Sequence, residues 1–351
     1  MVGFMAYGDG EKELSALPSR VCQTPPLVVQ EHDWLLVLDR KQQTITLHWQ
    51  SDCPQNRLEA IREKVHRRAV DPLSFCLSTG FKADTSHAQY LQALDQVDRY
   101  IHAGDTYQIN YAQRFQARYQ GSPLAAFLAL YQASPSPCSA FMDLGSHQIL
   151  SLSPERFIRV QGQQVETRPI KGTRRRGSTE QEDQQLIQEL VASPKDRAEN
   201  LMIVDLLRND LGRCCEIGSV TATPLFAVET YTNVHHLVST VRGRLRDEFT
   251  PLDMLLSAFP GGSITGAPKR RAMEIIRELE PAPRGAYCGS FFHWTPENGL
   301  DSTIAIRTLE CHQGQISCWG GGGIVADSEP EDEYQESLTK IRLFMEVLEG
   351  L

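Results

Sequence analysis

One lysine of this sequence stands beside a glycine at the expected end of a strand. It is Lys171, in the stretch RPIKGTRRRG that begins at Arg168, where Pro169 ends the preceding strand and Gly172 frees the backbone. A lysine held in this way can reach into a cleft as a nucleophile or bind an anion. A solvated basic loop is the alternative, and it is the simpler interpretation for Arg174–Arg176. Both interpretations stay open for Lys171.

A glutamate on the buried side of a predicted helix is the second candidate. Ser193 and Pro194 supply a cap and a first-turn proline for a helix near 193–210. Glu199 lies four residues before Ile203, so it follows the apolar stripe of that helix. A carboxylate there needs a partner, and the pattern leaves open a metal ion or an ion pair with an arginine.

Acidic residues begin the last predicted helix, near 329–349, at a regular spacing. Glu333, Glu336 and Lys340 lie at i, i+3 and i+7, along one line beside an apolar stripe. Two carboxylates one turn apart can bind a hard cation such as Mg²⁺, and the lysine one turn further can hold an anionic substrate. A solvated acidic first turn, favoured by the helix dipole, is the alternative.

Two glycine-rich segments mark places where the backbone can approach a ligand. Residues 261–269, GGSITGAPK, lead into a helix predicted near 268–280, so their N–H groups can bind an anion. They do not form a Walker A loop, because Ala267 stands where that motif requires lysine. The four glycines at 320–323 present no side chains, which predicts close contact with a flat ligand or with another backbone.

Three further polar residues belong to predicted strands or their ends. Glu155 follows a Ser-Pro pair at the start of a strand and can serve as a general acid if burial raises its pKa. His236 can hydrogen-bond a substrate oxygen, although a structural histidine is the alternative and His235 beside it blurs the signal. Arg307 lies in an apolar strand pattern, which predicts that it is buried against a carboxylate.

The elements that must position these residues are runs of strands with helices between them. Two apolar strands, at 34–38 and 44–49, flank a polar turn and predict a hairpin. Helical spacing predicts helices at 57–69 and, with Ser86 as cap, at 86–103, followed by a long strand at 106–119. We expect further strands near 138–168, 217–228 and 285–319, and further helices near 123–133, 180–208, 268–280 and 329–349. Consecutive strand runs favour an α+β fold over a doubly wound sheet.

Composition excludes several classes of protein. The 351 residues carry 44 acidic and 35 basic side chains, a formal net charge of −9, which argues against nucleic acid as the main partner. The length predicts one large domain or two subdomains. The longest early apolar run, 34–38, is too short to span a bilayer, and no secretory signal is visible. Nine cysteines without a CxxC pair argue against disulfides or structural zinc, so we expect reduced thiols in a cytoplasmic protein.

Together these segments resemble the chorismate-utilising enzymes, and within them the aminodeoxychorismate synthase branch. The resemblance covers about residues 85–351 and rests on segments that occur in the family's order. They are Gly104-Asp-Thr-Tyr-Gln-Ile-Asn, Ser153-Pro-Glu-Arg-Phe, Pro169-Ile-Lys-Gly-Thr, Asp205-Leu-Leu-Arg-Asn-Asp, His236-Leu-Val-Ser, Gly262-Ser-Ile-Thr-Gly-Ala-Pro-Lys, Ile304-Ala-Ile-Arg-Thr and Gly321-Gly-Gly-Ile-Val-Ala-Asp-Ser. The resemblance implies an α+β fold in which two packed antiparallel or mixed sheets form a sandwich with helices on the outside.

The resemblance also implies roles in the amination of chorismate to 4-amino-4-deoxychorismate, towards p-aminobenzoate and folate. Lys171 would attack the ring to form a covalent adduct, which ammonia displaces, and Glu155 would protonate the departing hydroxyl. Mg²⁺ would neutralise the ring carboxylate. The implied ligands are Glu199, Glu333 and Glu336 for the metal, Tyr287, Arg307, Gly321, Gly323 and Lys340 for the enolpyruvyl carboxylate, and Thr173, His236 and Ser263 for the pocket lining.

A partner subunit and a domain plan follow from the same resemblance. Ammonia would come from a separate glutamine amidotransferase subunit in a heterodimer, because this chain shows no candidate Cys–His glutaminase segment. The chain matches the family's N-terminal region only from Gly3-Phe-Met-Ala-Tyr-Gly onwards. We therefore expect a shortened N-terminal region over 1–84 and a chorismate-binding catalytic domain over 85–351.

Alternatives within and outside this activity remain open. Anthranilate synthase component I is one, although it has alanine where this chain has Lys171. A non-catalytic chorismate-binding remnant is another, and retention of Lys171, Glu155 and the three carboxylates argues against it. Water addition, as in isochorismate-forming relatives, is disfavoured because Gln108 stands where those enzymes place a lysine.

Overall fold

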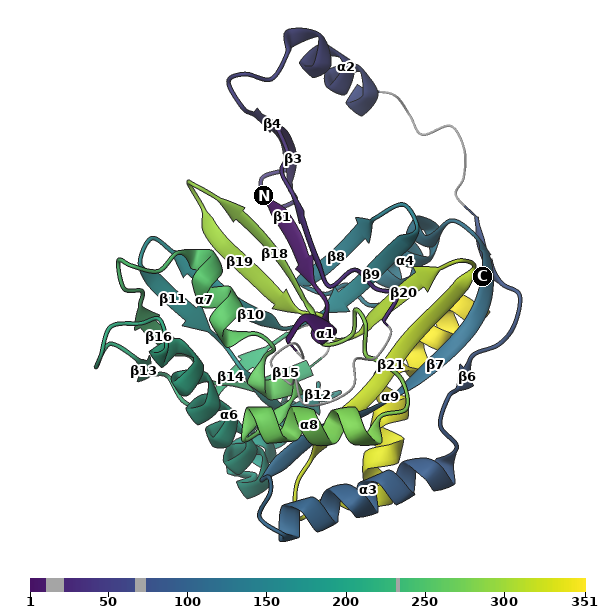
Figure 1. The fold of residues 1–351 in the computed structure, drawn as a ribbon, viewed down its shortest axis with the longest axis vertical. Helices are drawn as coiled ribbons and strands as arrows, with labels where there is room; N and C mark the ends of the chain where they lie inside the picture. The colour runs from purple at the N-terminus through teal and green to yellow at the C-terminus, as the bar shows by residue number, and fades with distance from the viewer. Residues whose placement is uncertain (11–21, 67–73, 232–233) are drawn as a thin grey trace.

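The structure is a computed structural model, and it describes residues 1–10, 22–66, 74–231 and 234–351. Its architecture is α+β, as predicted: two eight-stranded sheets pack together, with helices on the outside (Figure 1). Every strand pairing in the described part of the chain is antiparallel. Antiparallel strands can be joined by short hairpins, which is why consecutive strand runs in the sequence give this fold.

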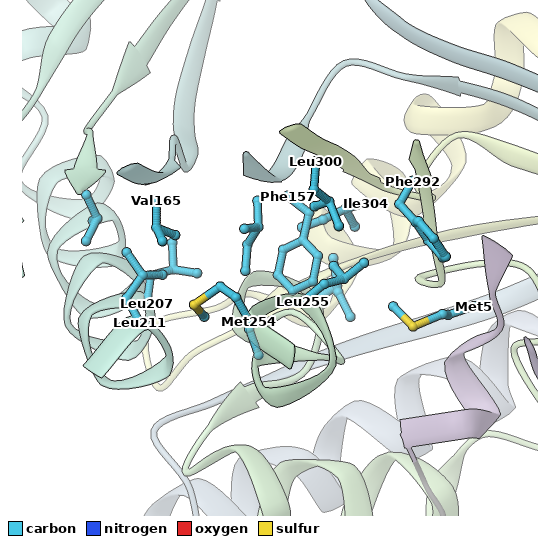
Figure 2. Packing of buried hydrophobic residues seen from close by; sticks show 14 of the residues in the cluster. Met5, Phe157, Val165, Leu207, Leu211, Met254, Leu255, Phe292, Leu300 and Ile304 are labelled. Carbon is cyan, nitrogen blue, oxygen red and sulfur yellow. The ribbon is translucent and has the colours of Figure 1, made fainter. Parts of the chain in front are cut away.

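The first sheet carries the larger part of the hydrophobic core. In spatial order its strands are β13 (Thr221–Ala222), β16 (Val241–Arg244), β11 (Gln164–Thr167), β10 (Arg156–Gln161), β19 (Gly299–Ile304), β18 (Ser290–Thr295), β1 (Val2–Met5) and β2 (Leu27–Gln30). Alternate residues of β19 are buried, so Leu300 and Ile304 face inward with Phe157 of β10. Helices α6 (Pro194–Gly212) and α7 (Pro251–Ala258) supply the apolar side chains that meet this layer (Figure 2).

The second sheet is built around one long strand, β7. Its main path runs through β17 (Gly266–Ala267), β7 (Gln108–Gly121), β21 (Gln315–Ile324), β20 (Thr308–His312), β9 (His147–Ser153) and β8 (Cys138–Asp143), while β5 (Phe75–Leu77) and β6 (Lys82–Ala83) also pair with β7. Helices α4 (Pro123–Ala133) and α9 (Pro330–Glu349) cover one face through a shared apolar cluster. Helices α3 (His87–His102) and α8 (Lys269–Leu279) pack beside them against β7.

A separate three-stranded sheet carries the lysine segment. It consists of β12 (Ile170–Arg175), β15 (Val234–Val238) and β14 (Ala227–Thr230), and α5 (Glu180–Ala192) and α6 pack against β12. The two large sheets meet through a separate cluster that includes Phe4, Phe291 and Ile149. The elements expected to bear the site, β12, β21, α6 and α9, therefore come from different layers of one packed molecule.

One helix prediction differs from the structure, and one further helix was not predicted, each for an identifiable reason. The helix predicted at 180–208 is two helices, because α5 ends at Ala192 and Ser193 caps α6. Pro194 has no N–H to continue the hydrogen bonds of α5, which explains the break. Helix α7 was not predicted, since eight residues are too few to show a clear apolar period; its capping box, Thr250 with Asp253, was the available signal.

The first 84 residues contribute strands to both large sheets. Strand β1 pairs with β18, and β5 and β6 pair with β7, so hydrogen bonds cross the predicted boundary between 1–84 and 85–351. The predicted hairpin forms as β3 (Trp34–Asp39) and β4 (Thr44–Trp49), which extends with α2 (Gln55–His66) from one end of the molecule (Figure 1). Residues 67–69 of the predicted helix lie outside the described residues. A single turn of helix, α1 (Tyr7–Gly10), follows β1.

Two expectations from composition can be compared with the structure. All nine cysteines are free thiols, as predicted. Across the described ranges, none of the helices combines the length and the apolar character that a membrane span requires.

Candidate active site

Lys171 lies at a bulge in the pairing of β12 with β15. Ile170 pairs with Val238 and Thr173 with His236, so β12 has one more residue than its partner at this point. Gly172 has φ +80°, a left-handed conformation that favours glycine, and a Cβ there would lie 2.9 Å from a methyl carbon of Leu190. The Gly172 that the sequence singled out is therefore what lets the strand present Lys171.

The Lys171 ammonium faces three of the predicted site carboxylates. Its charge lowers the pKa values of Glu155, Glu199 and Glu336, which come from β10's leading end, α6 and α9 respectively. The three arginines that follow Lys171 on the chain do not form a free basic loop. They pair with Asp196, Glu182 and Asp183 at the starts of α5 and α6, so they brace β12 against those helices.

Glu155 is a buried carboxyl group at the junction of β9 and β10. Its side chain accepts a hydrogen bond from Ser263 Oγ at 3.4 Å, and its backbone carbonyl accepts from the N–H of Ile304. Burial raises the pKa of Glu155 to about 7, against the opposing effects of the Lys171 ammonium and the Ser263 hydroxyl. A carboxyl group with this pKa can hold a proton near neutral pH and donate it, which is what a general acid must do.

His236 and Thr173 form a cross-strand pair beside Lys171. Thr173 Oγ1 and His236 Nδ1 are 2.9 Å apart, and burial lowers the pKa of His236 with help from the nearby Arg307 charge. His235 is different, since it is fully buried and its ring contacts Asp183 and Thr230. The strand alternation therefore makes His235 structural and leaves His236 as the histidine that faces the site.

Arg307 departs from its prediction. It is only half-buried, and no carboxylate in the described part of the chain forms an ion pair with it. Burial alone lowers its pKa, and its φ of +51° places it at a sharp turn between β19 and β20. The turn, rather than a strand, carries Arg307, and its guanidinium can serve an anionic ligand.

Tyr287 lies deeper in the molecule than a ligand-facing side chain usually does. It is 4% exposed and belongs to the main core cluster. Its ring stacks on Trp319 of β21, with centroids 6.0 Å apart and planes within 3°. Burial raises the pKa of the Tyr287 hydroxyl, so that group stays protonated. Its predicted contact with substrate stays a prediction.

Helix α9 packs directly on the tetraglycine segment of β21. A Cβ on Gly320 would lie 2.1 Å from the carbonyl oxygen of Ser337, so only glycine permits this approach. A Cβ on Gly322 would lie 3.1 Å from Glu333 Oε2, 3.4 Å from Glu336 Oε1 and 3.5 Å from Lys340 Nζ. The predicted close contact with another backbone is thus confirmed, and it gathers the charged line of α9 over β21.

Glu333, Glu336 and Lys340 on α9 are subject to opposing effects of burial and of neighbouring charges. Burial raises the pKa of Glu333, which accepts a hydrogen bond from Ser328 at 2.7 Å. Desolvation is the largest single effect on Glu336 as well, but Lys340, together with Lys171 and Lys195, outweighs it and lowers the pKa of Glu336 overall. Lys340 Nζ also donates to the carbonyl of Gly321 at 2.9 Å. Gly321 itself pairs with Ala112 of β7, and Gly323 with Asn110.

Glu199 completes the predicted set of metal ligands from the facing helix α6. Burial raises the pKa of Glu199, and the nearby charge of Glu336 adds to that effect. The carboxylates of Glu199 and Glu336 are therefore close enough for their charges to interact. No three His, Cys, Asp or Glu side chains in the described ranges are grouped closely enough to hold an ion as they stand. The donor chemistry nevertheless fits a hard cation such as Mg²⁺, which takes few protein oxygens and retains water.

Lys195 is a charged residue that the sequence analysis missed. It lies in the first turn of α6, four residues before Glu199, and its charge lowers the pKa values of Glu199, Glu333 and Glu336. Its i, i+4 spacing to Glu199 was the available signal.

The geometry brings most of the predicted residues to one region. The Lys171 charge acts on Glu155, Glu199 and Glu336. Glu333 and Lys340 of α9 lie beside Glu336, over Gly322. The Thr173–His236 pair lies near Arg307. An acid, a lysine, carboxylates for a cation and basic groups for an anion suit an enzyme that removes a hydroxyl from an acidic substrate.

The family model described as "chorismate binding enzyme" matches residues 1–346, and the chain belongs to this family.

Particular relatives refine that family assignment. The chain is 46% identical over 352 residues to aminodeoxychorismate synthase component 1 of Klebsiella aerogenes, covering 99% of this chain and 77% of that protein. It is 44% identical over 269 residues to anthranilate synthase component 1 of Thermus thermophilus, covering 77% and 58%. The solved structure of anthranilate synthase component I from Streptococcus pneumoniae superposes with a TM-score of 0.85 at 32% identity, covering 98% and 80%.

Proposed function

We propose that the chain aminates chorismate to 4-amino-4-deoxychorismate, with ammonia delivered by a separate glutamine amidotransferase subunit. The observation that carries this proposal is a buried carboxyl group, Glu155, whose pKa burial raises to about 7 and on which the Lys171 charge acts. Similarity to aminodeoxychorismate synthase component 1 over 99% of the chain supports the same product. The lysine matters most, because the resembling anthranilate synthases have alanine at this position.

Two side chains carry the chemical steps. Glu155 donates its proton to the hydroxyl that leaves the ring, and the C–O bond breaks to release water. Lys171 Nζ, as the free amine, forms a C–N bond to the ring as that bond breaks, and the positively charged nitrogen then passes a proton to the Glu155 carboxylate. Ammonia then adds at the carbon that lost oxygen, the bond to Lys171 breaks, and the proton released by the new ammonium group returns Lys171 to its amine form. Overall, chorismate and ammonia give 4-amino-4-deoxychorismate and water.

Basic groups and backbone hold the substrate's carboxylates. Arg307, which has no carboxylate partner among the described residues, serves the enolpyruvyl carboxylate, together with Tyr287 and the N–H groups of Gly321 and Gly323. Lys340 adds positive charge from α9. The Thr173–His236 pair and Ser263 line the pocket on the side of Lys171 and Glu155.

Three carboxylates are the proposed metal ligands. Glu199, Glu333 and Glu336 would hold Mg²⁺, which would supply positive charge to neutralise the ring carboxylate of the substrate. The raised pKa values of Glu199 and Glu333 reflect burial and, in both cases, repulsion from Glu336, which a divalent cation would relieve. Lys171, Lys195 and Lys340 supply part of that compensation within the protein itself.

The product identifies the activity. Incubation of the chain with chorismate, an ammonium salt and Mg²⁺ is expected to give 4-amino-4-deoxychorismate, detected as p-aminobenzoate after addition of the appropriate lyase. Fluorescent anthranilate formed without that lyase would assign the chain to the anthranilate synthase branch instead. Tight chorismate binding without turnover, at saturating ammonia and with the partner present, would indicate a non-catalytic remnant.

Substitution of Lys171 tests the covalent step. Lys171→Ala removes the nucleophile, and we expect amination to fall by at least about 100-fold. Intact-mass spectrometry of the wild type during turnover should show an adduct that this variant lacks. Lys82→Ala, at an exposed lysine of β6, is the matched control and should retain wild-type rates. Full activity in Lys171→Ala would exclude the covalent route.

A further inference from the structure

A buried ion pair follows helix α8, and the proposed chemistry does not use it. Arg284 and Glu280 have side chains that are 1% and 5% exposed. Arg284 Nε donates to Glu280 Oε2 at 2.9 Å and Nη2 donates to Oε1 at 2.7 Å, so the pair is bidentate. Because the two charges satisfy one another, the Arg284 guanidinium is not available for a substrate carboxylate, in contrast to that of Arg307.

The remaining hydrogen bonds of the pair go to backbone atoms. Arg284 Nη1 donates to the carbonyl of Ile264 at 2.8 Å, and Nη2 donates to the carbonyl of Asn110. Glu280 Oε1 accepts from the N–H of Ala112 at 2.9 Å. Strand β17 pairs with β7 only at Gln108 and Ile109. Beyond these residues the Arg284 and Glu280 side chains, rather than a neighbouring strand, hydrogen-bond the backbone along this edge of β7.

The backbone atoms held in this way adjoin both halves of the proposed site. Asn110 and Ala112 are the pairing partners of Gly323 and Gly321 on β21, where the enolpyruvyl carboxylate is proposed to bind. Ile264 ends the short turn Gly262–Ile264, which carries the Ser263 hydroxyl that contacts Glu155. One buried fork therefore connects the carboxylate-binding strand to the turn beside the general acid.

We propose that Arg284 and Glu280 are positioning residues, which fix the separation between the Glu155 side and the Gly321–Gly323 side of the site. This inference rests on the proposed function, because the two sides are defined by the substrate they hold. Neither side chain reaches the substrate. Their effect is exerted through the Ser263 turn and through β7, and a planar guanidinium is needed because it serves three acceptors at once.

Arg284→Lys is the variant that tests the geometry of the fork. Lysine keeps the positive charge beside Glu280 but cannot hold the carbonyls of Ile264 and Asn110 and the carboxylate in one plane. A misplacement of about 1 Å can reduce rates by about 100-fold, so we expect kcat/KM with chorismate and ammonium to fall by roughly that factor. The loss should appear both as a lower kcat and as a higher KM, since both sides of the site shift.

Glu280→Gln keeps the test decisive if Arg284→Lys folds poorly. Glutamine retains an oxygen that can accept from the N–H of Ala112, but it loses the charge that orients Arg284. We expect a smaller change in the same direction, with KM for chorismate raised severalfold. Affinity for chorismate without ammonia, measured by calorimetry, should weaken in parallel, and this readout does not depend on turnover.

Asp210→Asn is the matched control for general loss of stability. It breaks the buried Lys269–Asp210 ion pair, which joins α6 to the other end of α8. The control should lower the unfolding temperature as much as Arg284→Lys does, yet leave KM for chorismate within about twofold of the wild type. A fall in kcat and a rise in KM of the same size in Asp210→Asn would mean that destabilisation explains the effect, and would overturn the inference.

The outcomes separate this inference from the proposed function. Failure of the wild type to aminate chorismate would reject the function, whatever the variants do. Amination by the wild type together with an Arg284→Lys protein that is folded, and has unchanged kcat and KM, would reject the positioning role alone. A folded Arg284→Lys protein with both parameters changed, beside an unchanged control, would support it.

Discussion

At Glu155 two opposing effects act on a single carboxyl group. Burial disfavours the charged form, while the Lys171 ammonium and the Ser263 hydroxyl favour it, and the resulting pKa is about 7. A group balanced in this way is protonated for a useful fraction of the time at neutral pH. It can therefore donate a proton to a leaving hydroxyl and then stabilise the positive charge on Lys171.

The pH dependence of the reaction follows from that balance. An acid acts only while protonated, so kcat/KM should fall as pH rises through about 7. Ser263→Ala removes a hydrogen bond that lowers the pKa of Glu155, so its pKa should rise and the fall in kcat/KM should move to higher pH. Measuring kcat/KM from pH 5 to 9 at fixed Mg²⁺ locates this fall, which is the alkaline limb of the pH profile.

Two further variants test whether Glu155 causes the alkaline limb of the pH profile. Glu155→Gln should lose the limb and reduce the rate by about 10²–10⁴-fold, because glutamine cannot donate a proton in this way. Ser139→Ala, on β8, removes a hydroxyl that donates to the carbonyl of Ser136, and it should leave the fall in kcat/KM at the wild-type pH. A limb that moves to lower pH in Ser263→Ala would contradict the assignment of Glu155 as the acid.

At the scale of elements, the approach of α9 to β21 decides whether the carboxylates converge. The absence of side chains at 320–323 lets the helix backbone come close enough for Glu333 and Glu336 to gather over Gly322. Strand pairing with β7 then fixes the height of the glycine N–H groups relative to those carboxylates. One helix–strand contact thus positions both the proposed metal ligands and the proposed anion ligands.

Gly322→Ala should disturb the metal ligands before it disturbs the fold. The new Cβ would lie 3.1 Å from Glu333 Oε2 and 3.4 Å from Glu336 Oε1, which can move only by changing their geometry. We expect Mg²⁺ affinity to fall by about 10–100-fold, the range typical of disturbed ligand orientation. The measurement is the rise in unfolding temperature with Mg²⁺ concentration, which needs no turnover.

Gly80→Ala is the control for that substitution. Its Cβ would meet only Glu349 Oε1 at 3.7 Å, and its backbone is not left-handed, so Mg²⁺ should stabilise it as it does the wild type. Equal Mg²⁺ stabilisation of Gly322→Ala and Gly80→Ala would argue that the ion binds elsewhere. No Mg²⁺ stabilisation of the wild type would argue against the metal site as a whole.

The same scale shows what the sequence could and could not predict. Periodicity and caps predicted α3 with its Ser86 cap, α9 and the hairpin β3–β4, since those signals are local. The Thr173–His236 pair depends on the bulged register of β12 against β15, which no local pattern encodes. Glu280 and Arg284 have the spacing of an ordinary surface i, i+4 pair, and only the burial of both shows their connection to β7.

At the scale of the whole molecule, charge is distributed in a way that suits an anionic substrate. The net charge is −9, yet residues 327–340 alone hold six acidic residues and one basic residue, while residues 168–176 hold five basic residues and no acidic one. The structure sets these two segments on facing elements, since Lys171 lowers the pKa of Glu336. The acid excess argues against nucleic acid without opposing a small dicarboxylate whose binding involves a cation.

The whole molecule also bears on the source of ammonia. Release of ammonia from glutamine by a cysteine enzyme requires a thiolate, usually paired with histidine. Burial raises the thiol pKa of Cys138 and of Cys215 to about 11, and that of Cys288 to about 12. Within the described ranges no cysteine is hydrogen-bonded to a histidine; the partners of Cys53 and Cys214, for example, include Asp33 and Ser257 respectively.

We therefore expect the isolated chain to use ammonium salts but not glutamine. Product should form with chorismate, Mg²⁺ and ammonium, and glutamine should replace ammonium only after a glutamine amidotransferase subunit is added. Iodoacetamide treatment of the chain alone should leave the ammonium-dependent rate nearly unchanged, because none of the proposed steps uses a thiol. Glutamine-dependent amination by the chain alone, abolished by iodoacetamide, would show that one of its own cysteines releases ammonia and that no separate subunit is required.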